Sequence, residues 1–145
     1  MKIVLATDHA GFDLKNYVKE QLEKEGHEVE DFGAYEYDGL DDYPDFIIPA
    51  ARVVGSSSNT FGIIFGGSGQ GEAMAANRIK GVRAVVYYDG PTKIVQLSRQ
   101  HNNANVLSLG ARFISKEKAM DVIKMWLQTP FEGDRHLKRI KKLDQ

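Results

Sequence analysis

Residues 61–72 read FGIIFGGSGQGE, an apolar run that passes directly into a loop with four glycines. The run FGIIF predicts a buried strand over residues 61–65, and the segment after the loop predicts a helix over residues 73–79. A strand, a glycine-rich turn and a helix in this order are typical of parallel α/β proteins, in which helices connect neighbouring strands. In such sheets ligands bind beyond the carboxyl ends of the strands, which directs attention to residues 66–72.

The same alternation of strand and helix continues in both directions along the chain. Further strands are predicted over residues 2–7, 27–32, 82–88 and 105–109. Further helices are predicted over residues 12–24, 44–54, 92–99, 115–127 and 134–143. The run VRAVVYY at 82–88 has the strongest strand pattern of the chain. We therefore expect one domain over residues 1–145, an α/β sandwich with a five-stranded parallel sheet and an extra C-terminal helix.

Composition narrows the possible functional classes. The formal net charge of −1 gives no overall field that would favour nucleic acid or an anionic membrane. The absence of cysteine excludes disulfides, thiolate metal sites and cysteine nucleophiles. The first apolar run is too short for the core of a signal peptide and no stretch approaches a membrane span, so the expected location is the cytoplasm. No spacing of histidines and carboxylates matches a metal-binding motif.

The glycine loop ends in a carboxylate, Glu72, and this residue decides what the loop can bind. A dinucleotide fingerprint counted from Gly67 would need glycine at position 72, and a P-loop counted from Gly66 would need lysine there. A carboxylate beside backbone N–H groups suits a different reaction, in which it removes a proton next to a carbonyl while the amides hold the enolate oxygen. The other interpretation is a tight turn in which Glu72 only stabilises the first turn of the helix.

Polar side chains also stand next to two other strands. Asp8 and His9 come directly after the first strand, and His101 and Asn102 come shortly before the fifth. The position of Asp8 and His9 is compatible with a ligand-binding cleft and equally with an ordinary surface loop. His101 is followed by two asparagines. This pattern is compatible with a binding site and equally with a turn, in which asparagine is common.

The C-terminal segment DRHLKRIKKLD carries Arg135 and Arg139 at i,i+4 spacing on one helix face. Two guanidinium groups on one face match a phosphate dianion well, although a solvated basic face would have the same pattern. Leu137, Ile140 and Leu143 would form a separate apolar stripe on this helix.

The other histidines and the acids of the 33–43 loop give no signal for a site. We expect His27 and His136 to be structural or solvent-facing. The loop acids Asp38, Asp41 and Asp42 are expected to be solvated.

Five motifs in order along the chain together resemble the ribose-5-phosphate isomerase B family. They are DHAGFDLK at 8–15, DYPD at 42–45, GGSGQGE followed by AANR at 66–78, RQHNNANVL at 99–107 and FEGDRHLKRI at 131–140. The family also contains allose-6-phosphate and galactose-6-phosphate isomerases. The resemblance runs over essentially the whole chain. It implies a Rossmann-like α/β/α subunit, a homodimer or tetramer with active sites at the subunit interface, and no metal or organic cofactor.

Carried over residue by residue, the resemblance implies a role for each candidate. Asp8 and His101 resemble the pair that opens the furanose ring. The residues that resemble phosphate ligands are His9, Arg112, Arg135 and Arg139. The residues that resemble contacts to the sugar or to the enediolate are Tyr43, Gly67, Ser68, Gly69, Gly71 and Asn102, with Ser68 as a catalytic donor of the loop.

The catalytic base differs between two subgroups of the family. Many members have a cysteine at the position that is Gly66 here. A second subgroup lacks this cysteine and uses a glutamate at the position of Glu72. Because the chain has no cysteine and has Glu72, it resembles the glutamate subgroup.

We therefore expect an aldose–ketose isomerase of the pentose phosphate pathway that interconverts ribose 5-phosphate and ribulose 5-phosphate through ring opening and an enediolate. The main alternative is another sugar phosphate: allose 6-phosphate, galactose 6-phosphate or a tetrulose phosphate. Galactose-6-phosphate enzymes of this family work as complexes of two different subunits. A more distant alternative is a nucleotide-binding stress-type module, although such a module has its glycine loop near the last strand. A nucleic-acid module is opposed by the near-neutral charge and by the absence of interleaved aromatic residues in the basic tail.

Overall fold

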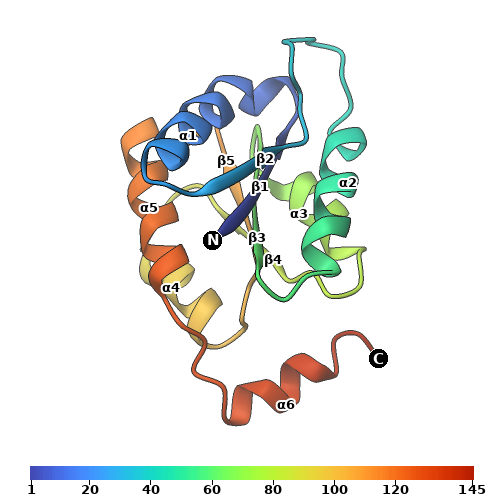
Figure 1. The fold of residues 1–145 in the computed structure, drawn as a ribbon, viewed down its shortest axis with the longest axis vertical. Helices are drawn as coiled ribbons and strands as arrows, with labels where there is room; N and C mark the ends of the chain where they lie inside the picture. Colours follow the sequence, from blue (N-terminus) through green and yellow to red (C-terminus); the bar gives the residue numbers. More distant parts are fainter.

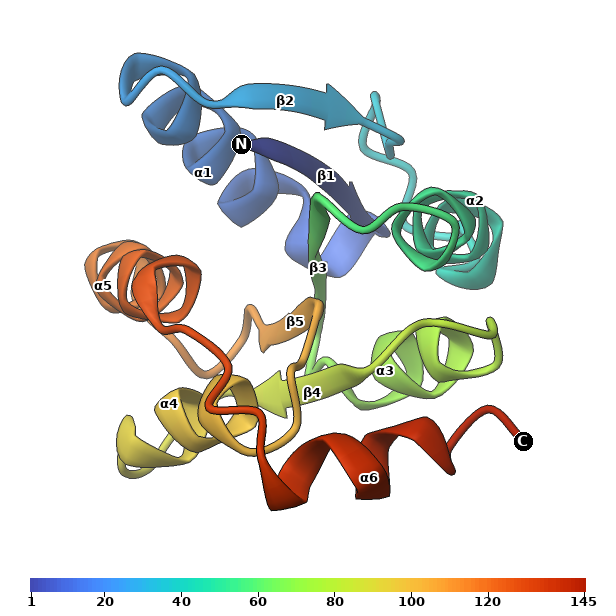
Figure 2. The same ribbon diagram turned by 60° about the horizontal axis from the view of Figure 1, so that its bottom comes forward.

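A sheet of five parallel strands lies at the centre of the protein, with helices on both of its faces (Figures 1 and 2). The computed structural model describes every residue from Met1 to Gln145. The strands are β1 (Lys2–Thr7), β2 (Glu28–Asp31), β3 (Thr60–Gly66), β4 (Ala84–Tyr87) and β5 (Val106–Gly110), in the spatial order β2-β1-β3-β5-β4. The helices are the 3-10 turn η1 (His9–Gly11), α1 (Phe12–Lys24), α2 (Pro44–Gly55), α3 (Gln70–Asn77), α4 (Lys93–Gln100), α5 (Lys116–Gln128) and α6 (Arg135–Lys141). The predicted Rossmann-like α/β sandwich with an extra C-terminal helix is confirmed.

The pleat of the central strands sends alternate side chains into two separate cores. Ile3 and Leu5 of β1 face the core beneath α1, α4 and α5, whereas Val4 and Ala6 face the core beneath α2 and α3. Because both faces are covered, the strands are continuous apolar runs rather than alternating ones. Figures 1 and 2 show α6 outside both helical layers, on the side of the sheet where the strands begin. None of the helices combines the length and the apolar character that crossing a bilayer requires.

β4 is shorter than the sequence pattern predicts. Residues 82–88 have the strongest strand composition, but only Ala84–Tyr87 pair, and they form an edge strand. The Asn77 side-chain amide bonds both the N–H and the carbonyl of Ala84, and Asn105 Oδ1 accepts from the N–H of Arg83. Asn105 thus takes the N–H just before β4, and Asn77 bonds the side of Ala84 that has no neighbouring strand, neither of which strand composition alone can reveal.

A buried lysine fixes the first helix to the sheet. Lys15 of α1 is fully buried, and its Nζ lies 2.9 Å from both carboxylate oxygens of Asp31 at the end of β2. Nζ also donates to the carbonyl of Ala34 at 2.8 Å. Since all three donors have acceptors, the buried charge is satisfied. The interaction holds the start of α1, and with it the Asp8–His9 turn, against the edge of the sheet where the strands end.

Candidate functional site

Residues 66–72 connect β3 to α3, which begins at Gln70 rather than at Ala73 as predicted. Gly69 is the N-cap of α3 with a φ of 80°, a left-handed conformation that glycine adopts without strain. Ser108 Oγ on the neighbouring strand β5 donates to the Gly69 carbonyl at 2.7 Å, which fixes the loop to the sheet. The first-turn N–H groups of α3 have no partners within the helix, so they supply hydrogen-bond donors at the carboxyl edge of the sheet.

Glu72 lies in the first turn of α3 and is only 5% exposed. Its carboxyl group packs against Gly66 at the end of β3, so closely that a Cβ at position 66 would collide with it. Burial raises the pKa of Glu72 and the nearby Asp8 carboxylate raises it further, while a hydrogen bond from its own backbone N–H opposes the shift. Helix capping does not require such burial. A buried carboxylate with a raised pKa is a stronger base than an exposed one, and this suits proton abstraction.

The turn after β1 places an imidazole and two carboxylates close together. Asp8 is buried, and its Oδ1 accepts from the N–H of Ala10 at 2.9 Å. The backbone N–H and the ring Nδ1 of His9 lie 3.0 Å and 2.7 Å from Asp41 Oδ1. This hydrogen bond raises the pKa of His9 most, the charges of Asp8 and Asp41 add to it, and burial and the charge of Arg112 oppose it. A protonated His9 beside Arg112 would form a positively charged rim that can bind an anion.

The prediction that Asp41 is solvated is wrong, because its carboxylate is 9% exposed and holds His9. The sequence around Asp41 carries no signal for this contact, because Asp41 is one of several acids in a glycine-containing loop. Asp41 is 32 residues away from its partner along the chain. Only the tertiary fold of the 33–43 loop brings the two side chains together.

Tyr43 and Arg112 cover the outer side of the glycine loop. A Cβ at Gly71 would lie 2.7 Å from the Tyr43 hydroxyl, and one at Gly67 would lie 2.9 Å from Arg112 Nη1. Both glycines therefore allow a close approach of a polar side chain to the loop backbone. Ser68 lies between them, half-buried, and its Oγ accepts from the N–H of Gln70 at 3.3 Å, which leaves its hydroxyl hydrogen free to donate.

A second group of predicted site residues lies at the amino edge of the sheet, the end at which the parallel strands begin. His101 follows α4 directly and precedes β5, and Arg135 and Arg139 are exposed on α6. Asn102 is exposed and lines a hollow of about 370 Å³ together with residues at the start of β4. Because His101 precedes a parallel strand and Glu72 follows one, the two residues belong to opposite edges of the same sheet.

His136 is the residue of this second group that the sequence did not predict. It is buried, and its ring stacks on that of His101 with a centroid distance of 4.3 Å and an interplanar angle of 15°. Leu137 of the expected apolar stripe and Leu143 beyond the end of α6 are 43% and 65% exposed, whereas His136 faces inward. Oε1 of Glu132 lies 3.8 Å from Nε2 of His101 and 3.9 Å from Nε2 of His136.

The structure thus brings together one part of the predicted site and leaves the other apart. The residues assembled at the carboxyl edge are Asp8, His9, Tyr43, Gly67, Ser68, Gly69, Gly71, Glu72 and Arg112. The residues at the amino edge are His101, Asn102, Arg135 and Arg139. The predicted ring-opening pair, Asp8 and His101, is therefore divided between the two edges within one chain.

Two sets of side chains come close enough to share an ion, although no sequence spacing predicted a metal motif. They are Asp8 with His9 and Asp41, and His101 with Glu132 and His136, and in each set the candidate ligand atoms lie within 4.8 Å of one another. In the first set, Asp41 already holds the His9 ring and Asp8 caps η1. In the second set the rings are parallel, so their nitrogen lone pairs run side by side instead of converging on one point. Neither arrangement is prepared to bind a metal ion.

Comparison with known proteins agrees with the motifs and the fold. The family model described as Ribose/Galactose Isomerase matches residues 3–143. The chain belongs to the ribose/galactose isomerase family. Among relatives of the family, the probable ribose-5-phosphate isomerase B of Mycoplasma pneumoniae is 42% identical over 97% of this chain and 91% of its own length. The ribose-5-phosphate isomerase B of Mycolicibacterium paratuberculosis is 40% identical over 97% and 87%.

Solved structures of the family have the same fold over almost the whole chain. The ribose-5-phosphate isomerase B of Mycoplasma genitalium, crystallised with bound ribulose 5-phosphate, is 40% identical and superposes with a TM-score of 0.93, covering 98% of this chain and 93% of that one. The enzyme from Thermotoga maritima is 43% identical with a TM-score of 0.91, covering 99% and 97%. Family membership also makes the nucleotide-binding and nucleic-acid alternatives unnecessary.

Proposed function

We propose that this protein is an aldose–ketose isomerase that interconverts ribose 5-phosphate and ribulose 5-phosphate. The observation that carries the proposal is the buried Glu72 carboxylate, which packs against Gly66 beside the N-terminus of α3. This places a base with a raised pKa next to the backbone N–H groups of the loop, the arrangement that abstraction of a proton next to a carbonyl requires. The relatives named ribose-5-phosphate isomerase B support the choice of substrate.

In the proposed reaction, Glu72 removes the hydrogen from C2 of the open-chain aldose and returns it to C1. The hydroxyl proton at O2 moves to O1 in the same sequence, so that the aldehyde becomes a hydroxymethyl group and C2 becomes the ketone. The loop N–H groups of residues 67–71 and the Ser68 hydroxyl stabilise the negative charge of the enediolate. One such donor contributes on the order of 10²–10³-fold, and general base catalysis contributes on the order of 10²–10⁴-fold.

Ring opening and phosphate binding involve residues at both edges of the sheet. In the proposal, Asp8 and His101 transfer protons between the ring oxygen and the anomeric hydroxyl, and Tyr43 and Asn102 contact the sugar. The phosphate ligands are His9, Arg112, Arg135 and Arg139. Because the two edges are apart within one chain, the complete site needs a second copy. A two-fold axis perpendicular to the strands reverses the second sheet and sets its amino edge beside the carboxyl edge of the first.

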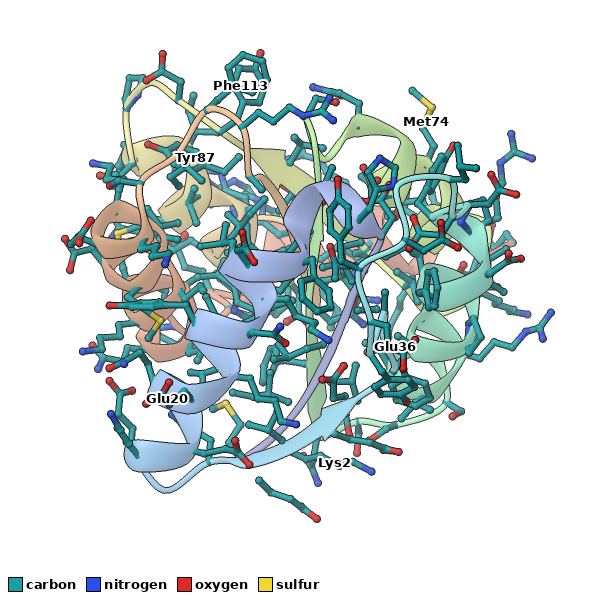
Figure 3. All side chains as sticks on the ribbon, turned by 90° about the horizontal axis from the view of Figure 1, so that it is seen from above. Lys2, Glu20, Glu36, Met74, Tyr87 and Phe113 are labelled. Carbon is teal, nitrogen blue, oxygen red and sulfur yellow. The ribbon has the colours of Figure 1, made fainter.

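The edge strand β4 is the side on which we place this second copy. Met74 of α3 and Phe113 after β5 project outward on this side of the molecule (Figure 3) and are 64% and 62% exposed. Ile94 of α4 and Tyr88 after β4 are exposed as well. An edge strand flanked by exposed apolar side chains favours an interface. The proposed unit is a homodimer of one-domain subunits that acts in the cytoplasm, where charged sugar phosphates are retained.

Two measurements test the proposed function. Purified protein in D₂O should transfer deuterium from solvent to the carbon-bound positions of the sugar during turnover of ribose 5-phosphate, and the Glu72→Gln variant should not. Comparison of kcat/KM for ribose 5-phosphate, allose 6-phosphate, galactose 6-phosphate and a tetrulose phosphate should favour the first. We expect activity to survive a strong chelator, because the proposed steps use only protein groups. No exchange with any of these sugars would overturn the proposal.

A further inference from the structure

The surroundings of His136 are unusual for a histidine in a helix that otherwise carries exposed basic residues. The residue is 6% exposed, and its Nε2 is buried without a hydrogen-bond partner. Burying a nitrogen without a hydrogen-bond partner destabilises the folded state, and an apolar residue would fill the same space without this loss of stability. The nearest carboxylate oxygen, that of Glu132, is 3.9 Å from Nε2, beyond hydrogen-bond distance, and the face of the His136 ring lies parallel to that of His101.

Burial and the neighbouring charges together lower the pKa of His136. Burial lowers the pKa of His136 most, the positive charges of Arg135, His101 and Arg139 lower it further, and only Glu132 opposes them. His101 is more accessible, since its side chain is 38% exposed against 7% for His136.

We propose that His136 is a positioning residue whose buried ring acts as a flat platform that holds the His101 ring in the plane needed for ring opening. The inference rests on the proposed function of His101. His101 follows the last residue of α4 and makes only an ion-pair distance of 3.8 Å to Glu132, so no hydrogen bond of its side chain fixes the ring. Stacking on a buried neighbour supplies this constraint, and an imidazole that must reach a sugar oxygen at hydrogen-bond distance gains from it.

The test separates ring opening from proton transfer at carbon. Ribulose 5-phosphate cannot close a five-membered ring, because its fifth oxygen carries the phosphate. Solvent deuterium exchange at C1 of ribulose 5-phosphate therefore requires Glu72 but no ring opening. Three variants are compared with the parent protein: His136→Ala removes the platform, His136→Phe keeps a flat ring without nitrogen, and His27→Ala is the control. His27 is matched because it also lies 3.9 Å from a carboxylate, that of Glu25.

We expect His136→Ala to lower kcat for ribose 5-phosphate by about 10- to 100-fold with little change in KM, because a misplaced catalytic group costs on this order. Deuterium exchange into ribulose 5-phosphate should remain within about two-fold of the parent, since the Glu72 steps do not depend on His101. His136→Phe should retain kcat within about three-fold, because the flat face is kept. His27→Ala should match the parent in both assays.

Three results would overturn the inference. The first is unchanged turnover of ribose 5-phosphate by His136→Ala. The second is an equal loss of turnover and exchange in that variant, which would mean a structural role for the ring. The third is a loss in His136→Phe as large as that in His136→Ala. A parent protein without any exchange would instead overturn the proposed function itself, so the two failures are distinguishable.

Discussion

Replacing Glu72 by glutamine removes the proposed base while keeping the shape of the side chain. Glu72 is 5% exposed and packs against Gly66, so water has little access to replace the missing carboxylate. Loss of a general base costs on the order of 10²–10⁴-fold in kcat, or about 3–5 kcal/mol of transition-state stabilisation. Substrate contacts remain, so KM should change little. Glu117, an exposed acid in the first turn of α5, provides the matched control Glu117→Gln.

The same substitution should change stability in a pH-dependent way. Burial raises the pKa of Glu72 in the folded state, so its ionisation opposes folding. Below the pKa of an unfolded glutamate, about 4.3, Glu72 is protonated and the parent protein has its full free energy of unfolding from this group. The parent protein loses this contribution to its stability as the pH rises through the higher pKa of Glu72 in the folded state. The free energy of unfolding of Glu72→Gln relative to the parent should therefore grow as the pH rises above about 4.

Two measurements check these expectations together: steady-state kinetics with ribose 5-phosphate, and thermal unfolding at several pH values. The expected result is a variant that is almost inactive and folded, with a relative stability that increases with pH. Turnover within about three-fold of the parent, against the 10²–10⁴-fold loss expected for a base, would refute the assignment of Glu72. A difference in free energy of unfolding that does not change with pH would refute the claim that burial of the ionised Glu72 carboxylate destabilises the folded state.

Three further predictions follow from the contacts of the site. Gly66→Ala adds a Cβ where the Glu72 carboxyl group lies, so kcat should fall by at least about 10-fold while KM stays similar; equal kinetics would contradict the packing. Asp41→Asn removes the partner that raises the pKa of His9, so the rise of KM with increasing pH should begin at a lower pH, and a pH profile of KM that does not move would contradict this role. Arg139→Ala should raise KM for ribose 5-phosphate by about 10-fold or more with a smaller effect on kcat, and an unchanged KM would contradict a phosphate role.

Much of the fold follows from local patterns in the sequence. Apolar runs such as 61–65 predicted buried strands, and the helix predicted over residues 115–127 is α5, whose N-cap Ser115 accepts from the N–H of Lys118 through its Oγ. The start of α3 was predicted too late, because glycines at 69 and 71 have low helix propensity although Gly69 is the N-cap. The length of β4 was overestimated, because the N–H of Arg83, just before the strand, donates to the side chain of Asn105, 22 residues away, instead of to a neighbouring strand.

The site was predictable to the extent that topology determines it. Side chains that follow parallel strands meet at one edge, and this is where Asp8, Glu72 and Arg112 lie. The same rule places His101, which precedes β5, at the other edge, so the division of the site is already implied by the order of elements. The contacts of Asp41 and His136 were not predictable, because each depends on how a loop or the last helix packs against residues far away in the chain.

The central claim is that Glu72 of one subunit and His101 of another form one active site. It is tested most directly by co-expressing Glu72→Gln and His101→Asn chains with different tags and purifying the mixed complex by both tags in succession. In a two-fold dimer of these chains one site carries both substitutions and the other carries neither, so the mixed complex should recover about half of the parent activity per dimer. Each variant alone should be almost inactive. A mixed complex as inactive as the two separate variants would contradict a site shared between subunits.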